Sequence, residues 1–110
     1  MLIFPLKKQW YEKIKSGEKT IEYREVKPFW TTRFYNDLGF FPEQCPKDFD
    51  FPRRDCFLGL GYTGKYLHAI ITKIEVVDGK DTDLHIDKPV YAIHLSDVRE
   101  IINDRSYGLL

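Results

Sequence analysis

The first 17 residues change from a short apolar run to a helical pattern. Residues 2–4 are apolar and are followed by Pro5, which predicts a first strand that stops there. Over residues 7–16 the apolar side chains recur at helical spacing and the charged ones cover the opposite side, which predicts a helix. Gly17 follows at the place where a residue in the left-handed conformation commonly ends a helix, so we expect the helix to end there.

A strand pattern begins directly after that glycine, over residues 19–24. Ile21 and Tyr23 fall on one side of this segment. The other side carries three polar residues, which are Thr20, Glu22 and Arg24. This alternation is typical of a strand that is buried on one side only.

Residues 27–55 combine frequent prolines with many aromatic side chains. Four of the six prolines fall here, and proline at this density disfavours both helices and central strands, so we expect an irregular excursion. Disordered segments are poor in aromatic residues, whereas this one holds eight. We therefore expect the excursion to pack its own rings, with short helical turns.

Three further strands are predicted in the second half of the chain. They cover residues 56–61, 66–77 and 90–95, with a turn around Thr63 and Gly64 between the first two. The segment 66–77 is apolar on both faces in places, as expected for a central strand.

The end of the sequence carries a helix-start signal. Ser96 or Asp97 is a suitable cap, and Glu100 follows Asp97 at the spacing of a capping box, which predicts a short C-terminal helix. About five strands with few, short helices predict an α+β fold in which a curved, mostly antiparallel sheet forms a small barrel with a helix at its mouth. At 110 residues the chain has the length of one domain, so we expect residues 1–110 to form a single domain.

The charges balance in total but not along the chain. There are 17 basic and 17 acidic residues, and a neutral protein is unsuited to coating duplex nucleic acid over a broad surface. Residues 1–33, however, hold 8 basic and 4 acidic side chains, and residues 55–110 are acidic on balance. A local basic site therefore remains compatible with the composition. The acidic second half would then limit indiscriminate binding of polyanions.

Localisation and metal chemistry follow from absences in the sequence. No apolar stretch approaches the roughly 18 residues of a membrane span, and no signal peptide precedes the first strand, so we expect a cytoplasmic protein without a membrane partner. Cys45 and Cys56 are too few for a disulfide framework, and no histidine stands at zinc-site spacing. We therefore expect the protein to bind no metal ion and no cofactor. The aspartates of residues 78–87 do not follow the pattern of a calcium-binding loop, so we expect them to form a solvated connection between strands.

The candidate chemistry lies at the junction of the first helix and the second strand. Lys19 sits in the turn, and Thr20, Glu22 and Arg24 follow on one side of the strand. A cation, a carboxylate and a guanidinium so close together suit a ligand with both donors and acceptors, such as a nucleobase or a phosphate. The alternative is an exposed ladder of ion pairs without a ligand, worth at most about 1 kcal/mol.

The same stretch resembles a known family. The pattern Gly-x-Lys-x-x-Glu-x-Arg over residues 17–24 is similar to the signature of ASCH domains in the PUA-like superfamily, and the helix before it is also similar. The resemblance is closest over residues 1–33, looser for the later strands, and does not extend to residues 34–55. It implies a PUA-like pseudo-barrel with a cleft, lined by the motif, that takes RNA, nucleotides or modified nucleosides. Binding of RNA or a nucleotide-like ligand is thus the leading expectation.

Hydrolysis is the alternative that the resemblance offers. Some members are amidohydrolases of acylated cytidine, which use the motif lysine and a threonine three residues later, and a few are reported as metal-dependent ribonucleases. Lys19 matches the lysine, but Glu22 stands where the threonine is expected. An enzyme of this type would have to use Lys19 and Glu22, whereas binding requires only the cleft.

Other residues would extend such a cleft. Trp30 and Arg33 follow the motif, and a tryptophan near cations can stack a base, or else pack in the core. Lys65 lies in an aromatic, basic turn that would border the cleft, or simply form a hairpin. A third class of function is protein interaction, in which the aromatic excursion, with Phe40 and Phe41, would cover a partner.

Overall fold

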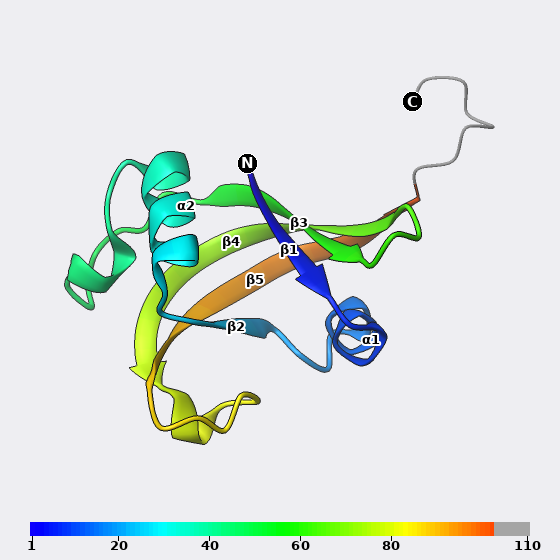
Figure 1. Cartoon of the computed structure of the whole chain (residues 1–110). Coiled ribbons are helices and arrows are strands. Elements are labelled where there is room, and N and C mark those ends of the chain that lie inside the picture. The colour runs from blue at the N-terminus through cyan, green and yellow to red at the C-terminus, as the bar shows by residue number, and fades with distance from the viewer. Residues whose placement is uncertain (103–110) are drawn as a thin grey trace.

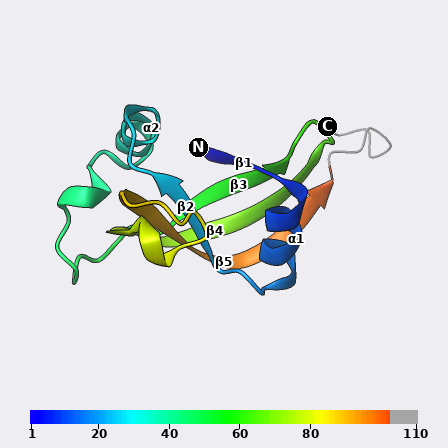
Figure 2. The same cartoon turned by 60° about the horizontal axis from the view of Figure 1, so that its bottom comes forward.

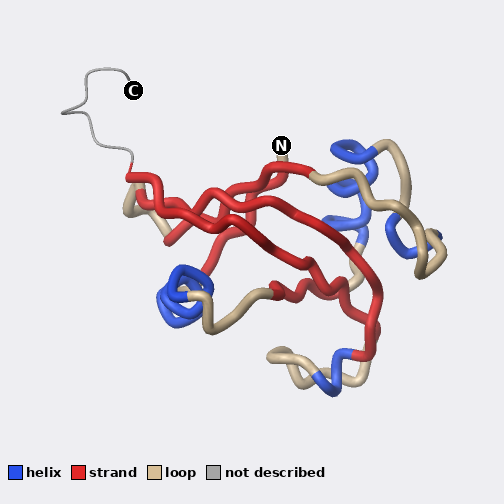
Figure 3. The backbone as a smooth tube through the Cα atoms, turned by 180° about the vertical axis from the view of Figure 1, so that it is seen from behind, coloured by secondary structure: helices blue, strands red, loops and turns tan. Residues whose placement is uncertain are grey.

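Two long strands form the centre of the molecule. In the computed structural model, which describes residues 1–102, β4 (Lys65–Asp78) and β5 (Pro89–Ile102) pair antiparallel. β3 (Arg54–Leu60) pairs antiparallel with β4, and β2 (Ile21–Glu25) pairs antiparallel with β5. β1 (Leu2–Leu6) joins β3 in parallel and completes the order β1-β3-β4-β5-β2. The sheet curls into a half-barrel whose two edges are β1 and β2 (Figures 1 and 3).

The two α-helices lie toward opposite ends of this curled sheet, as the two views in Figures 1 and 2 agree. α1 (Lys8–Ser16) connects β1 to β2 and ends at Gly17, whose φ of 85° is the predicted left-handed cap. α2 (Pro28–Leu38) follows β2. Two short 3₁₀ turns, η1 (Pro42–Gln44) and η2 (Gly79–Asp81), lie in the loops. Among the described residues, no helix is long and apolar enough to cross a membrane.

The core fills the hollow of the half-barrel. Side chains from the inner face of the sheet meet one face of each helix, and each large apolar side chain buried in this way contributes about 1.5–3 kcal/mol. The largest of those that are almost wholly buried include Phe4, Tyr11, Ile14, Phe34, Leu58, Leu67, Ile71, Tyr91 and Ile93.

The helix α2 was not expected, because the proline count suggested an irregular segment. Pro28 occupies the first turn of α2, where its missing N–H has no intrahelical partner to lose, so it starts the helix instead of breaking it. Trp30, Phe34 and Leu38 then recur at intervals of four and are buried together. The rest of the excursion does pack its own rings as predicted, with Phe40 against Phe49 at 5.2 Å between ring centroids.

The predicted C-terminal helix is wrong, because β5 continues as a strand to Ile102. The residues read as a cap form a β-bulge: Ser96 pairs with Ile70 and Arg99 with His68, so β5 holds one residue more than β4 between these pairs. Asp97 lies in the bulge with a φ of 53°, a left-handed conformation that aspartate tolerates better than most residues. A local capping pattern thus competes with pairing along the length of β4, and the pairing prevails.

Candidate functional site

The open side of the half-barrel lies between its edge strands, and Arg24 bridges it. From β2 its guanidinium donates a hydrogen bond to the Pro5 carbonyl of β1 at 2.7 Å. The same group lies over the rings of Phe4 and Trp30, at 5.5 and 5.0 Å from their centroids. Glu22, on the same side of β2 as Arg24, is only 7% exposed, and Ile21 and Tyr23 lie on the other side of the strand. The polar side of β2 therefore faces the interior of the half-barrel.

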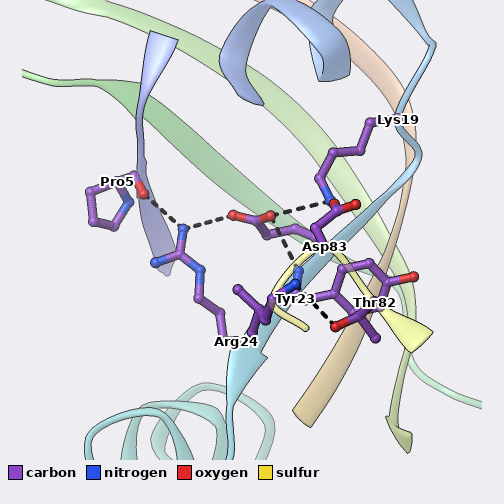
Figure 4. Close-up of polar contacts among 8 residues, drawn as sticks. Pro5, Lys19, Tyr23, Arg24, Thr82 and Asp83 are labelled. Carbon is purple, nitrogen blue, oxygen red and sulfur yellow. Dashed lines mark hydrogen bonds and ion pairs between the residues drawn. The ribbon is translucent and has the colours of Figure 1, made fainter. Parts of the chain in front are cut away.

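A row of alternating charges runs along this opening (Figure 4). Glu22 lies at its centre and accepts a hydrogen bond from Arg24 at 2.8 Å, while the Lys19 ammonium lies 3.7 Å from its other oxygen. The Lys19 ammonium also donates to Asp83, which comes from the loop between β4 and β5. Lys19, Glu22 and Arg24 of the motif thus lie in one row with Asp83, in which cations and carboxylates alternate.

The row is not an exposed ladder of ion pairs. The side chains of Lys19 and Glu22 are each 9% exposed and that of Arg24 is 18% exposed. Charges held away from water in this way interact more strongly than exposed pairs and must be well partnered to persist. Every buried polar side-chain atom in the described residues has a hydrogen-bond partner, so this condition is met.

Two adjoining hollows follow the row of charges. One, of about 310 Å³, lies beside Lys19 and Thr20, and the other, of about 400 Å³, lies beside Glu22 and Arg24. Trp10, Tyr23 and Asp83 border both. We call the two hollows together the edge-strand groove.

Aromatic rings form one wall of the edge-strand groove. The Lys19 ammonium lies 5.3 Å from the ring centroid of Trp10 and 4.7 Å from that of Tyr23, within cation–π range. Burial, together with the negative charges of Asp83 and Glu75, raises the pKa of the Tyr23 hydroxyl, so that it stays protonated and available as a donor at neutral pH. Two flat surfaces and a set of donors therefore meet in one concavity.

Three residues that border the edge-strand groove were not identified as site residues from the sequence. Trp10 counted only as part of the apolar face of the helix, Tyr23 as the apolar side of the strand, and Asp83 as part of a solvated connection. No local signal marks Asp83, because it reaches Lys19 only through the curl of the sheet, across 64 residues of chain.

The remaining predicted site residues are placed differently. Trp30 borders the groove but is 8% exposed, and its ring stacks on Phe4 at 5.0 Å between centroids. Arg33 lies on the exposed side of α2, with its guanidinium 3.4 Å from the Phe29 ring centroid, and does not line the groove. Lys65 begins β4 in the hairpin and also lies outside the groove.

The cysteines and two of the histidines, residue types that often act as nucleophiles or metal ligands, do not form such a site. Burial raises the pKa of the Cys56 thiol to about 12 and also raises that of Cys45, which keeps both in the unreactive thiol form. His94 lies 2.6 Å from Glu75, and His68 lies 3.4 Å from Asp55, in separate pairs. Among residues 1–102 no three histidine, cysteine or acidic side chains gather as a metal site would need.

Comparison with known proteins adds no identification. No family model, no curated protein and no solved structure matches the chain. The chemistry of the edge-strand groove must therefore be judged from its own residues.

Proposed function

We propose that the edge-strand groove binds RNA or a nucleotide-like ligand, and that the chain is a PUA-like protein of the ASCH type. The observation that carries this proposal is the convergence of the motif residues Lys19, Glu22 and Arg24 in one concave, aromatic-walled opening. A nucleobase presents donors and acceptors at one edge and a flat apolar face, and the groove offers a counterpart to each.

Each side chain has a distinct role in this proposal. The Glu22 carboxylate accepts hydrogen bonds from an exocyclic amino or a hydroxyl group, and Lys19 and Arg24 donate to base or sugar oxygens. Trp10 or Tyr23 provides the stacking face, an interaction worth roughly 1–3 kcal/mol per base. Trp30 contributes behind Arg24, by holding the guanidinium in place.

The dimensions of the groove favour an unpaired nucleotide over a duplex. Its hollows measure about 310 and 400 Å³, the scale of a small-molecule site. Sequence-specific recognition of RNA generally uses single-stranded bases that can turn out and stack. We therefore assign a single-stranded segment or a free nucleotide to the groove.

The test is a calorimetric titration with a mixed-sequence single-stranded RNA decamer. We expect Lys19→Ala and Arg24→Ala to weaken binding at least tenfold, because each removes a donor from the groove. Arg33→Ala and Lys65→Ala are matched controls, since they remove exposed cations outside it. Circular dichroism melts identify any variant that fails to fold.

Two results would contradict binding by the groove. Unchanged affinity in folded Lys19→Ala and Arg24→Ala would exclude the motif as the site. Turnover of an acylated cytidine that disappears in Lys19→Ala would instead indicate the hydrolase, with Lys19 and Glu22 in the reacting site.

A further inference from the structure

The loop between β4 and β5 brings a fixed carboxylate into the edge-strand groove. Asp83 accepts a hydrogen bond from the Lys19 ammonium, which belongs to the turn before β2 (Figure 4). The Asp83 side chain is 38% exposed, whereas that of Lys19 is 9% exposed, so Asp83 lies on the solvent side of the pair. A ligand that approaches Lys19 from solvent meets Asp83 first.

The loop holds Asp83 in place through its own hydrogen bonds. Thr82, which is 6% exposed, donates from its hydroxyl to the Gly79 carbonyl at 2.9 Å and accepts from the Leu84 amide at 3.2 Å. The Gly79 amide donates to the Lys88 carbonyl at 2.8 Å, which closes the base of the loop. A Cβ at Gly79 would lie 2.6 Å from that carbonyl, so only glycine fits this closure. Asp83 is therefore presented by a structured loop.

The charges of the row are already balanced without a ligand. Lys19 lies between Asp83 and Glu22, and Glu22 also holds Arg24, so two carboxylates face two cations. The groove as a whole is nearly balanced, because five cations and four carboxylates line it. A phosphate that entered would have to displace Asp83 from Lys19 or lie beside two carboxylates that repel it. An uncharged base or sugar edge meets no such opposition, because it exchanges hydrogen bonds without adding charge.

We infer that Asp83 is a specificity-determining residue that screens Lys19 and selects against phosphate groups in the edge-strand groove. The selection against phosphate rests on the proposed function, whereas the screening of the Lys19 charge by Asp83 does not. Recognition then depends on the base and sugar, while phosphates stay outside the groove. Removal of the Asp83 charge should open Lys19 to anions.

The first experiment needs no ligand and uses tryptophan fluorescence. Trp10 lies beside Lys19 and is half-buried, whereas Trp30 is 8% exposed, so collisional quenching reports mainly on Trp10. In Asp83→Asn we expect the quenching constant for iodide to rise about twofold and that for neutral acrylamide to stay unchanged. Asp81→Asn is the control, because it removes the same charge from the same loop but from a residue that does not line the groove. Equal iodide quenching in the wild type and Asp83→Asn, or an equal rise in Asp81→Asn, would overturn the inference.

The second experiment compares adenosine with adenosine 5′-monophosphate by calorimetry. Asp83→Asn should gain at least fivefold in affinity for the monophosphate relative to adenosine, and Asp81→Asn should not. If both probes bind and the ratio of their affinities does not change, the inference is wrong and the proposed function stands. If neither probe nor single-stranded RNA binds either protein while iodide quenching rises as expected, the proposed function is wrong and the screening of Lys19 by Asp83 stands.

Discussion

Arg24 illustrates how one side chain links the fold to the site. Its guanidinium donates to the Pro5 carbonyl and to Glu22, and its central carbon lies 5.0 Å from the Trp30 ring centroid. Both hydrogen bonds come from one terminal nitrogen, Nη2, so this single atom joins β1 to the carboxylate of β2. The arginine of the motif therefore also supports the edge of the half-barrel. A loss of binding in Arg24→Ala could therefore come from a weakened fold. It indicates a binding role only if Lys19→Ala shows the same loss, because Lys19 contacts Glu22 and Asp83 and does not join the two edge strands.

A second residue-scale link, between Tyr11 and Glu100, predicts a pH effect. The buried Tyr11 hydroxyl donates to the Glu100 carboxylate at 2.8 Å, and this hydrogen bond is the largest cause that lowers the pKa of Glu100, followed by Lys15. Because the folded-state pKa lies below the unfolded one, this group stabilises the fold above the unfolded pKa, and the stabilisation is lost as pH falls through the folded pKa. Tyr11→Phe keeps the ring and removes the hydrogen bond, so we expect the pKa of Glu100 to rise and the acid loss of stability to become shallower. Carboxyl NMR titration measures the first effect and urea unfolding between pH 3 and 6 the second. An unchanged pKa of Glu100 in Tyr11→Phe would show that the hydroxyl does not set it.

At the scale of elements, the sequence was informative wherever the signal was local. The helix that ends at Gly17 and the strands on either side of the 61–64 turn follow from periodicity and glycine alone. Two elements were misassigned: α2 depends on where its proline stands in the helix, and the end of β5 depends on pairing with the distant β4. Pro28 breaks a helix in its interior but starts one in its first turn, and a proline count does not distinguish the two. The convergence of Lys19, Glu22 and Arg24 was predictable from strand alternation, whereas the burial of their side required the curl of the sheet.

The bulge in β5 provides a prediction at this scale. Asp97 holds a φ of 53°, which β-branched residues adopt at a cost of roughly 1–2 kcal/mol, while glycine adopts it freely. We expect Asp97→Val to lower the free energy of unfolding by that amount and Asp97→Gly to change it by less than about 1 kcal/mol. The ion pair of Asp97 with Arg53 is exposed and contributes little to either difference. Urea denaturation at neutral pH measures both values. If Gly and Val were equally tolerated, the left-handed bulge would be excluded.

At the scale of the whole molecule, the total charge is zero although cations line the edge-strand groove. The reason is that the sheet brings the basic and the acidic halves of the sequence together. The basic first 33 residues supply Lys19 and Arg24, and the acidic second half supplies Asp83 to the same groove. Little net positive charge remains there to attract a phosphate backbone at long range. Affinity must then come from short-range contacts along the groove, and this consequence can be measured.

The measurement is the salt dependence of RNA binding. Single-stranded nucleic acid releases counterions with a slope of about −0.7 in log K against log salt for each phosphate neutralised. Because the five cations that line the groove face four carboxylates, we expect at most two phosphates to be neutralised. The slope for the RNA decamer should then be no steeper than about −1.4 between 50 and 200 mM KCl, measured by fluorescence anisotropy. A duplex of the same length should bind more weakly at every salt concentration, because its bases cannot enter the groove. A slope of about −4 or steeper, or preference for the duplex, would mean that an extended basic surface binds the backbone. In that case the groove would not be the site of recognition, whatever the effect of changing Lys19.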